Sequence, residues 1–203
     1  MSQIGVVGKN ILLLGKRGTG KTTIAIDYFL QNKDKFCNFT CISPTEDLNN
    51  NYSNLIPSHS IFRDFDPELV KNYSNSQMSN GLLIMDDCII LRRNDKEYEA
   101  IRNALENRLL TNVIADQVQH LNPLLREKSD YIFVLKQPMR YESDKIYKCF
   151  GGMFPNYEVF KKYLNKATGD YGALVIDNTS ISDKIEDRVY FYRSKKNEQL
   201  IFV

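Results

Sequence analysis

The residues from Gly15 to Thr23 restrict the possible folds of this chain more than any other part of its sequence. They read Gly-Lys-Arg-Gly-Thr-Gly-Lys-Thr-Thr, and all but the last fit the pattern G-x-x-x-x-G-K-[ST] in full. An apolar run, Ile11–Leu14, leads into them, and Lys21–Gln31 has the apolar spacing of an amphipathic helix. This pattern binds phosphate when it connects a strand to a helix, so we expect a phosphate-cradling loop here.

Each residue type in this loop has a physical role. Glycines let the backbone turn so that successive N–H groups point inward, and the helix N-terminus adds positive partial charge. We expect Lys21 to reach the β- and γ-phosphates of a nucleotide, Thr22 to ligate Mg²⁺, and Thr23 to bond an α-phosphate oxygen. The predicted nucleotide-binding residues are Gly15, Lys16, Arg17, Gly18, Thr19, Gly20, Lys21, Thr22 and Thr23. A glycine-rich turn that matches by chance is the alternative, and the flanking strand and helix argue against it.

Short apolar runs alternate with helical patterns along the rest of the chain, as in an α/β fold. The expected strands are Asn10–Gly15, Phe36–Ser43, Gly81–Cys88, Asn112–Gln117, Tyr131–Lys136, Gly172–Asp177 and Arg188–Tyr192. The expected helices are Lys21–Gln31, Asp66–Tyr73, Asn94–Leu110 and Pro155–Ala167. Runs this rich in Ile, Val and Leu suit strands that are buried on both faces. We therefore predict a single domain over residues 1–203 with a three-layer P-loop NTPase fold, in which helices cover both faces of a mostly parallel sheet.

Three local features refine this prediction. The last two strands are separated by a short polar stretch, so we expect them to form a β-hairpin at the sheet edge. Asp66 and Asn94 have the residue type and the sequence context of helix N-caps. The stretch Pro44–Ser60 is rich in Asn, Ser and Pro, and we expect it to be a long surface loop without regular structure.

Two aspartates end the expected strand Gly81–Cys88. Four apolar residues, Leu82–Met85, run directly into Asp86 and Asp87. We expect Asp86 to hold Mg²⁺, and Asp87 to polarise the attacking water as a general base or a positioning group. A strand that ends in solvent with two charged residues is the alternative for the pair taken alone. Together with the phosphate loop, the second acid favours water as the acceptor, and therefore hydrolysis.

The next strand, Asn112–Gln117, ends in polar groups. Gln117 is our candidate for a group that hydrogen-bonds the γ-phosphate or the attacking water, with Gln119 and Asp116 as alternatives. Ring ATPases also use an arginine from a neighbouring subunit, worth roughly 10³–10⁵ in rate. Arg108 and Arg126 are the candidates for this arginine finger. For each of these side chains, a solvent-exposed position without a catalytic role is the alternative.

Composition adds a few limits. The formal net charge of +2 is too small to indicate nucleic-acid binding, so DNA contacts would need a local patch or a ring of subunits that adds their charges. No apolar run is long enough to span a bilayer, and Lys9 and Asn10 interrupt any signal-peptide pattern. The four cysteines lack zinc-site spacing, so we expect reduced thiols in an intracellular protein.

Several segments, in this order, resemble the DNA-packaging ATPases of nucleocytoplasmic large DNA viruses and virophages, within the FtsK–HerA superfamily. The segments are Leu12–Tyr28, Gly81–Cys88, Pro123–Leu135, Tyr171–Asn178 and Arg188–Arg193. They are spread along most of the chain. The first is common to many P-loop proteins, and the others in this order are more specific. The chain departs from the family at Asn107–Leu109, where the family has Gly-Arg-His, and the match of Gln117 needs a gap.

The resemblance implies a Mg²⁺-dependent ATPase that moves double-stranded viral DNA into a capsid. It implies a ring of identical subunits, a pentamer or hexamer, that docks on viral capsid or portal-vertex proteins. It places the protein in the cytoplasm of the infected host cell, at the virus factory, or in the virion. It assigns ATP to Gly15–Thr23, Mg²⁺ and water to Asp86 and Asp87, γ-phosphate sensing to Gln117, and the finger to Arg108.

Two other functions would use the same loop. A nucleoside or nucleotide kinase needs an arginine-rich lid, and Pro44–Phe65 offers only Arg63. A GTP-dependent switch needs Asn-Lys-x-Asp after a strand, which neither Asn32–Asp34 nor Asn165–Ala167 completes. The kinase is the stronger of these two alternatives.

Overall fold

The fold is built on a β-sheet in which the parallel strands all end, at their carboxyl termini, along the same side of the sheet. The computed structural model describes residues 7–75, 80–88, 96–107 and 110–194. Within these ranges the sheet has eight strands in the order β3-β2-β4-β5-β1-β6-β7-β8. The strands are β1 (Asn10–Leu14), β2 (Asn38–Ile42), β3 (Ile61–Phe62), β4 (Gly81–Asp86), β5 (Leu110–Asp116), β6 (Tyr131–Val134), β7 (Ala173–Asp177) and β8 (Val189–Tyr192). All pairings from β3 to β6 are parallel, whereas β7 and β8 pair antiparallel at the edge. The predicted mostly parallel sheet and its terminal hairpin are confirmed.

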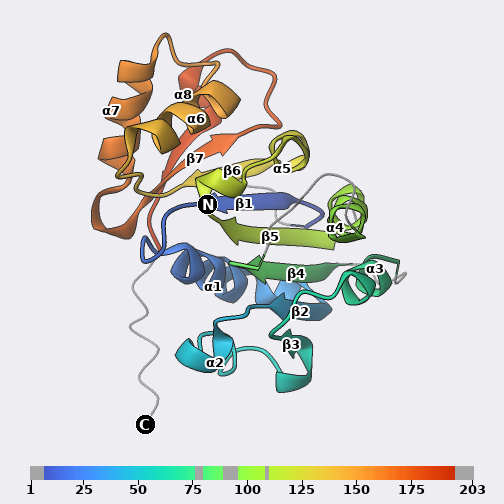
Figure 1. The fold of residues 1–203 in the computed structure, drawn as a ribbon. Coiled ribbons are helices and arrows are strands. Elements are labelled where there is room, and N and C mark those ends of the chain that lie inside the picture. The colour runs from blue at the N-terminus through green and yellow to red at the C-terminus, as the bar shows by residue number, and fades with distance from the viewer. Residues whose placement is uncertain (1–6, 76–79, 89–95, 108–109, 195–203) are drawn as a thin grey trace.

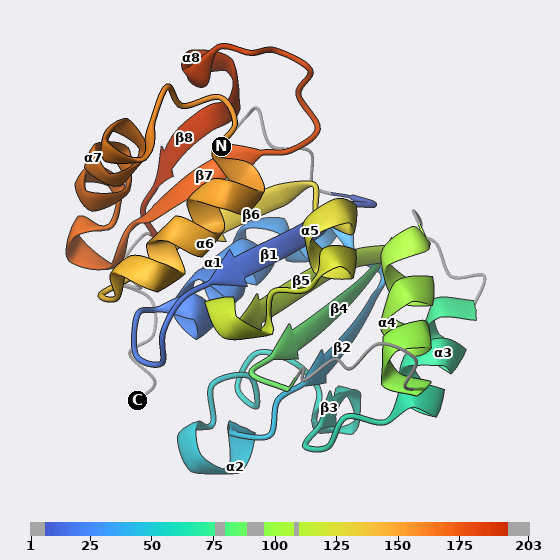
Figure 2. The same ribbon diagram turned by 45° about the horizontal axis from the view of Figure 1, so that its top comes forward.

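Helices cover both faces of the sheet. They are α1 (Lys21–Asn32), α2 (Glu46–Asn49), α3 (Pro67–Asn75), α4 (Lys96–Glu106), α5 (Pro123–Lys128), α6 (Arg140–Phe150), α7 (Tyr157–Ala167) and α8 (Ile185–Arg188). Successive residues of β1 point to opposite faces: Leu12 and Leu14 pack with α3 to α7, and Ile11 and Leu13 pack with α1. Figure 1 shows the arrangement, and Figure 2 shows α4, α5 and α6 in front of the sheet with α1 behind it. The predicted three layers are therefore confirmed. No helix within the described ranges is long and apolar enough to cross a membrane.

The segment predicted to be an irregular loop is partly ordered by its own carboxylate. Residues 44–60 contain α2 and a short 3-10 turn, Ser58–Ser60. The carboxylate of Glu46, which is buried, accepts hydrogen bonds from the backbone N–H groups of Tyr52 and Ser53. Tyr52 and Ile56 enter the core on the α1 face. The prediction of a wholly irregular loop was wrong. It relied on the content of Asn, Ser and Pro, whereas the hydrogen bonds of one buried residue, Glu46, order the turn.

Other differences are local. The Asp66 side chain accepts a hydrogen bond from the Glu68 N–H at 2.9 Å, as expected of an N-cap. Asn94, the other predicted cap, lies outside the described residues. Helices α5 and α6 were not predicted. The residues that helix α6 buries are Ile146 and Phe150 together with the polar Glu142 and Ser143.

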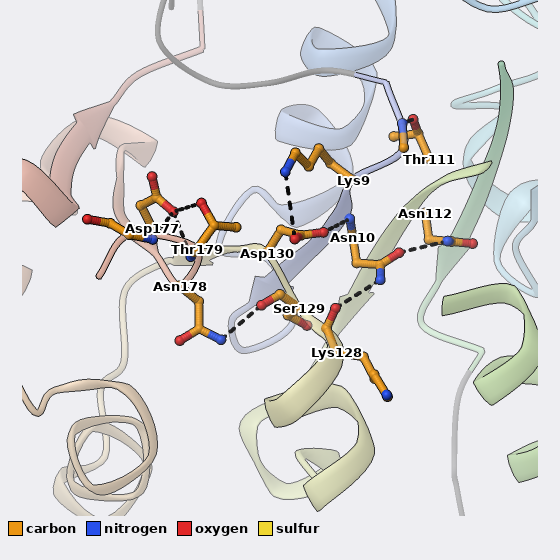
Figure 3. Close-up of polar contacts among 12 residues, drawn as sticks. Lys9, Asn10, Thr111, Asn112, Lys128, Ser129, Asp130, Asp177, Asn178 and Thr179 are labelled. Atoms are coloured by element: carbon orange, nitrogen blue, oxygen red, sulfur yellow. Dashed lines mark hydrogen bonds and ion pairs between the residues drawn. The ribbon is translucent and has the colours of Figure 1, made fainter. Parts of the chain in front are cut away.

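A polar network joins the elements at the amino-terminal end of the sheet (Figure 3). The Asn10 side chain donates to the carbonyl oxygens of Leu105 and Lys128 and accepts from the Asn112 amide at 2.8 Å. The Asn10 N–H donates to the Asp130 carboxylate at 2.8 Å. The ends of α4, α5, β1 and β5 are thereby bonded through one buried asparagine.

Candidate nucleotide-binding site

The phosphate loop joins the carboxyl end of β1 to α1 and has the shape that its glycines predict. Gly18 and Gly20 have φ angles of +79° and +102°, which favour glycine. A Cβ on Gly15 would lie 2.4 Å from Thr19 Oγ1, so a side chain there would displace the loop. The Gly15 N–H donates to the Asp116 carbonyl at the end of β5, which ties the loop to the neighbouring strand.

A cavity of about 380 Å³ opens on this loop. The loop residues that line it are Arg17, Gly18, Gly20, Lys21, Thr22 and Thr23. The remaining lining comes from Asp87 after β4, Tyr171 before β7, and Thr45, Asn49 and Asn51 around α2. Six of the nine predicted nucleotide-binding residues therefore face one cavity, whereas Gly15, Lys16 and Thr19 shape the turn behind it.

The two aspartates at the carboxyl end of β4, of which Asp86 is the last residue of the strand, pair with successive residues of the loop. Thr22 Oγ1 donates to Asp86 Oδ2 at 2.7 Å, and the Lys21 ammonium lies 3.2 Å from Asp87 Oδ1. Asp87 has a φ of 53°, a left-handed conformation that is uncommon for a non-glycine residue and occurs often at functional sites. The chain turns sharply at this point, which leaves Asp86 buried and Asp87 exposed on the cavity.

The surroundings of Asp86 fit a Mg²⁺ ion. Its Oδ2 accepts hydrogen bonds from Thr22 and from the Tyr52 hydroxyl, the latter at 2.9 Å. Its Oδ1 is buried and has no hydrogen-bond partner among the described residues. Burial raises the pKa of this carboxyl group above its ordinary range. A carboxylate and a hydroxyl beside a phosphate site are the oxygen ligands that Mg²⁺ takes together with phosphates. Within the described ranges no cluster of three or more His, Cys, Asp and Glu side chains is placed to hold a metal.

The end of β5 places Asp116 nearer to the loop than Gln117. The Asp116 carbonyl accepts from Gly15, and its side-chain Oδ1 accepts from the Gln117 N–H and lies 2.7 Å from His120 Nδ1. Its Oδ2 is buried without a partner among the described residues, and burial raises the pKa of the group. Gln117 is half-buried, does not line the cavity, and accepts a hydrogen bond from Gln119. The sensor role stays a prediction for all three alternatives.

Of the two candidate arginines, the structure describes only Arg126, which does not line the cavity. Arg108 lies outside the described residues. Arg126 is exposed on α5. This helix follows β5 and is followed by Asp130, whose N–H donates to the carbonyl of Asn10 at the amino end of β1. The finger stays a prediction for both residues.

Sequence reasoning missed two tyrosines in this site. Tyr52 contacts Asp86 across 34 positions of sequence, and nothing in its local pattern signals that contact. Tyr171 follows Asp170, and both have positive φ angles, of 57° and 49°. Its exposed ring lies over Gly20 of the phosphate loop. Nothing in the local sequence pattern indicates that this ring would lie over the phosphate loop.

Several viral proteins are similar in sequence to this chain over nearly its full length. The chain is 31% identical over 211 residues to uncharacterized protein L437 of Acanthamoeba polyphaga mimivirus, covering 94% of this chain and 74% of that protein. It is 30% identical over 203 residues to uncharacterized protein 075L of Invertebrate iridescent virus 6, covering 93% and 78%. No protein-family model matches the chain.

Solved structures share the fold. B204, the DNA-packaging ATPase from Sulfolobus turreted icosahedral virus, matches with a TM-score of 0.68 and 16% identity, over 94% of this chain and 100% of B204. The genome packaging NTPase B204 from Sulfolobus turreted icosahedral virus 2, in complex with ATP-gammaS, matches with a TM-score of 0.64 and 16% identity, over 91% and 96%. At this identity the likeness shows the fold alone, which is that of a P-loop NTPase.

Proposed function

The chain belongs to the same family as protein L437 of Acanthamoeba polyphaga mimivirus and protein 075L of Invertebrate iridescent virus 6, and on this premise we propose that it is a Mg²⁺-dependent ATPase that packages viral DNA. The viral relatives and the fold shared with B204, a DNA-packaging ATPase, support the biological setting. We propose that residues 1–203 act as one P-loop ATPase domain. The FtsK–HerA resemblance of the sequence points the same way.

One observation carries the proposal of hydrolysis: adjacent aspartates at the end of β4 have different environments. Asp86 is buried against Thr22, whereas Asp87 reaches the cavity beside Lys21. A buried, hydroxyl-bonded carboxylate suits a metal, and an exposed one suits a water molecule. A strand that simply ended in solvent would leave both carboxylates hydrated.

The roles follow from these positions. Lys21 binds the β- and γ-phosphates of ATP, which releases Asp87 from its ion pair to accept a hydrogen bond from the attacking water. Thr22 and Asp86 hold Mg²⁺, which, when bound, neutralises charge on the phosphates. Thr23 bonds the α-phosphate. Gln117, or Asp116 in its place, senses the γ-phosphate.

We propose that the subunits form a pentameric or hexameric ring around double-stranded DNA. Arg108 or Arg126 of one subunit would then stabilise the transition state in its neighbour. A ring also adds the small positive charge of each chain. Docking on capsid or portal-vertex proteins, at the virus factory in the cytoplasm of the infected cell or in the virion, completes the proposal.

The test is ATP hydrolysis by the purified full chain with and without double-stranded DNA. We expect DNA to stimulate hydrolysis, and Asp87→Asn to lower the rate by roughly 10²–10⁴-fold because the water loses its hydrogen-bond acceptor. Lys21→Ala should abolish hydrolysis and weaken ATP binding. The matched controls, Asp34→Asn and Lys33→Ala, change exposed residues beyond α1 and should behave as wild type. Hydrolysis that ignores DNA in the assembled protein would rule out packaging while leaving the ATPase in place.

The kinase alternative has less support in the structure. Arg63, the only arginine in the stretch 44–65, pairs with Asp47, with 2.5 Å between Nε and Oδ1, and does not line the cavity. Phosphate transfer to a nucleoside or nucleotide in the same assay would nevertheless establish a kinase.

A further inference from the structure

We infer that Tyr52 is a positioning residue that orients Asp86 toward the metal, so that the segment Thr45–Ser53 links the nucleotide cavity to the metal-binding carboxylate. This inference rests on the proposed function. It gives a purpose to an ordered segment that composition alone predicts to be an irregular loop.

The first observation is how the two oxygens of Asp86 are used. Both hydrogen bonds, from Thr22 at 2.7 Å and from Tyr52 at 2.9 Å, end on Oδ2. Oδ1 is buried and has no partner among the described residues. Two donors on Oδ2 fix the rotation of the carboxylate and leave the other oxygen, Oδ1, without a hydrogen bond. An open oxygen at a fixed position is what a cation ligand requires.

The second observation concerns what changes when a cation binds. Thr22 is the residue of the loop whose hydroxyl turns to the metal. Tyr52 then becomes the donor that holds Oδ2. Its hydroxyl is suited to this, because the side chain is buried and already donates to Oδ2 at 2.9 Å. Orientation of a metal ligand by such an outer partner is worth about 10- to 100-fold in metal affinity or activity.

The third observation is how Tyr52 itself is held. Glu46 Oε1 accepts from the N–H groups of Tyr52 and Ser53 and from the Ser53 hydroxyl, at 2.9, 2.7 and 2.6 Å. The Tyr52 carbonyl in turn accepts from the N–H groups of Leu55 and Ile56. The buried phenol therefore sits at the end of a braced turn and has little freedom to leave Asp86.

The fourth observation is that the same segment lines the cavity. Thr45, Asn49 and Asn51 face the space in front of the phosphate loop, and Asn51 is the residue before Tyr52. A nucleotide that contacts these residues would contact the same backbone segment that positions the side chain of Tyr52. Binding of the nucleotide and orientation of the metal ligand are therefore coupled through a few covalent bonds.

The test uses Tyr52→Phe, which keeps the ring in the core and removes only the hydroxyl. We expect the Mg²⁺ concentration for half-maximal ATPase activity to rise about 10- to 100-fold, with the KM for ATP at saturating Mg²⁺ unchanged. The same shift should appear without catalysis, in calorimetric titrations of ATP-gammaS at graded Mg²⁺ concentrations. Glu46→Gln, which weakens the brace, should shift the Mg²⁺ dependence in the same direction by a smaller factor.

Tyr73→Phe is the matched control. Its hydroxyl donates to the carbonyl oxygens of Asn38 and Leu82, away from the phosphate loop, so the variant loses a tyrosine hydroxyl without touching Asp86. It should leave the Mg²⁺ dependence as in the wild type. A Tyr52→Phe protein that folds and keeps the wild-type Mg²⁺ dependence in both assays would overturn the inference. If Tyr52→Phe does not fold, an unshifted Glu46→Gln protein has the same force.

The two proposals fail differently. A wild-type chain that binds ATP-gammaS with Mg²⁺ but hydrolyses no ATP would refute the ATPase and leave the role of Tyr52 open to the binding assay. A wild-type ATPase with an indifferent Tyr52→Phe variant would refute only the role of Tyr52.

Discussion

The two ends of the central sheet treat buried polar groups in opposite ways. At the amino end, Asn10 and its neighbours match donors to acceptors, and Asn112 Oδ1 is the buried oxygen without a partner among the described residues there (Figure 3). At the carboxyl end, Asp86 Oδ1, Asp116 Oδ2 and Gln137 Oε1 are all buried without partners within the same ranges. An unpaired buried polar atom costs stability unless a ligand supplies its partner. The paired groups at the amino end therefore stabilise the fold, whereas the unpaired atoms at the carboxyl end fit the nucleotide and metal site proposed above.

The largest expected effect breaks the stabilising end. Asn10→Ala removes an amide that donates to two backbone carbonyls and accepts from Asn112, leaving these partners buried. We expect the free energy of unfolding to fall by about 2–4 kcal/mol, measured by urea denaturation. The folded fraction should still bind ATP-gammaS, because the network lies at the far end of the sheet. A loss below the error of the measurement would contradict the contrast between the two ends.

A smaller effect of opposite sign is expected at the functional end. Burial raises the pKa of Asp86 above 3.8, so its proton is held more tightly in the folded chain than in the unfolded one. Its charge therefore lowers stability above the unfolded pKa, and this cost disappears as the pH falls below it. Asp86→Asn should stabilise the nucleotide-free protein by about 1 kcal/mol at pH 7, while abolishing hydrolysis.

Urea denaturation between pH 3 and pH 7 measures this difference, which should vanish at roughly pH 3, below the ordinary aspartate pKa of about 3.9. Asp34→Asn, at an exposed carboxylate beyond α1, is the control for a generic loss of charge. A destabilised Asp86→Asn protein at pH 7 would show that the carboxylate stabilises the fold rather than awaiting a ligand.

The smallest expected effect is at Tyr171. Its left-handed backbone is strained for a tyrosine, and its side chain is 68% exposed, so Tyr171→Gly should stabilise the chain by about 0.5 kcal/mol. The ring lines the cavity, and its loss should weaken ATP-gammaS binding several-fold, as measured by calorimetry. Asp170→Gly relieves a similar backbone strain without changing the ring, so its nucleotide affinity should stay at the wild-type value. Equal affinity in both variants would exclude a contact between the ring and the nucleotide.

The sequence predicted those strands that are buried on both faces, because their apolar residues form continuous local runs. Strand β4 is buried at every position, and its apolar run ends at Asp86 in both the prediction and the structure. Helix α6 was not predicted: two of the four residues that it buries, Glu142 and Ser143, are polar, and its N-cap position is Met139, which gives no capping signal. A short helix of this kind offers little local evidence of where it begins.

The parts of the site that consist of residues contiguous in the sequence could be predicted. The loop at Gly15–Thr23 and the pair Asp86–Asp87 are local patterns, and the structure brings them together because the carboxyl ends of β1, β5 and β4 coincide. Tyr52 and Asp116 depend on contacts between distant segments. Their roles follow from the order of strands, which a single sequence does not display.

The lengths of the outermost strands bear on how copies of this chain can assemble. Among the described residues, β3 has two residues and β8 has four, so the described part of each edge presents few backbone groups with which a foreign strand could pair. Short edges are one way in which proteins avoid growth of a sheet from one molecule into the next. Contacts between neighbouring copies would therefore fall to helices and loops, which can slide and separate without breaking a continuous ladder of hydrogen bonds.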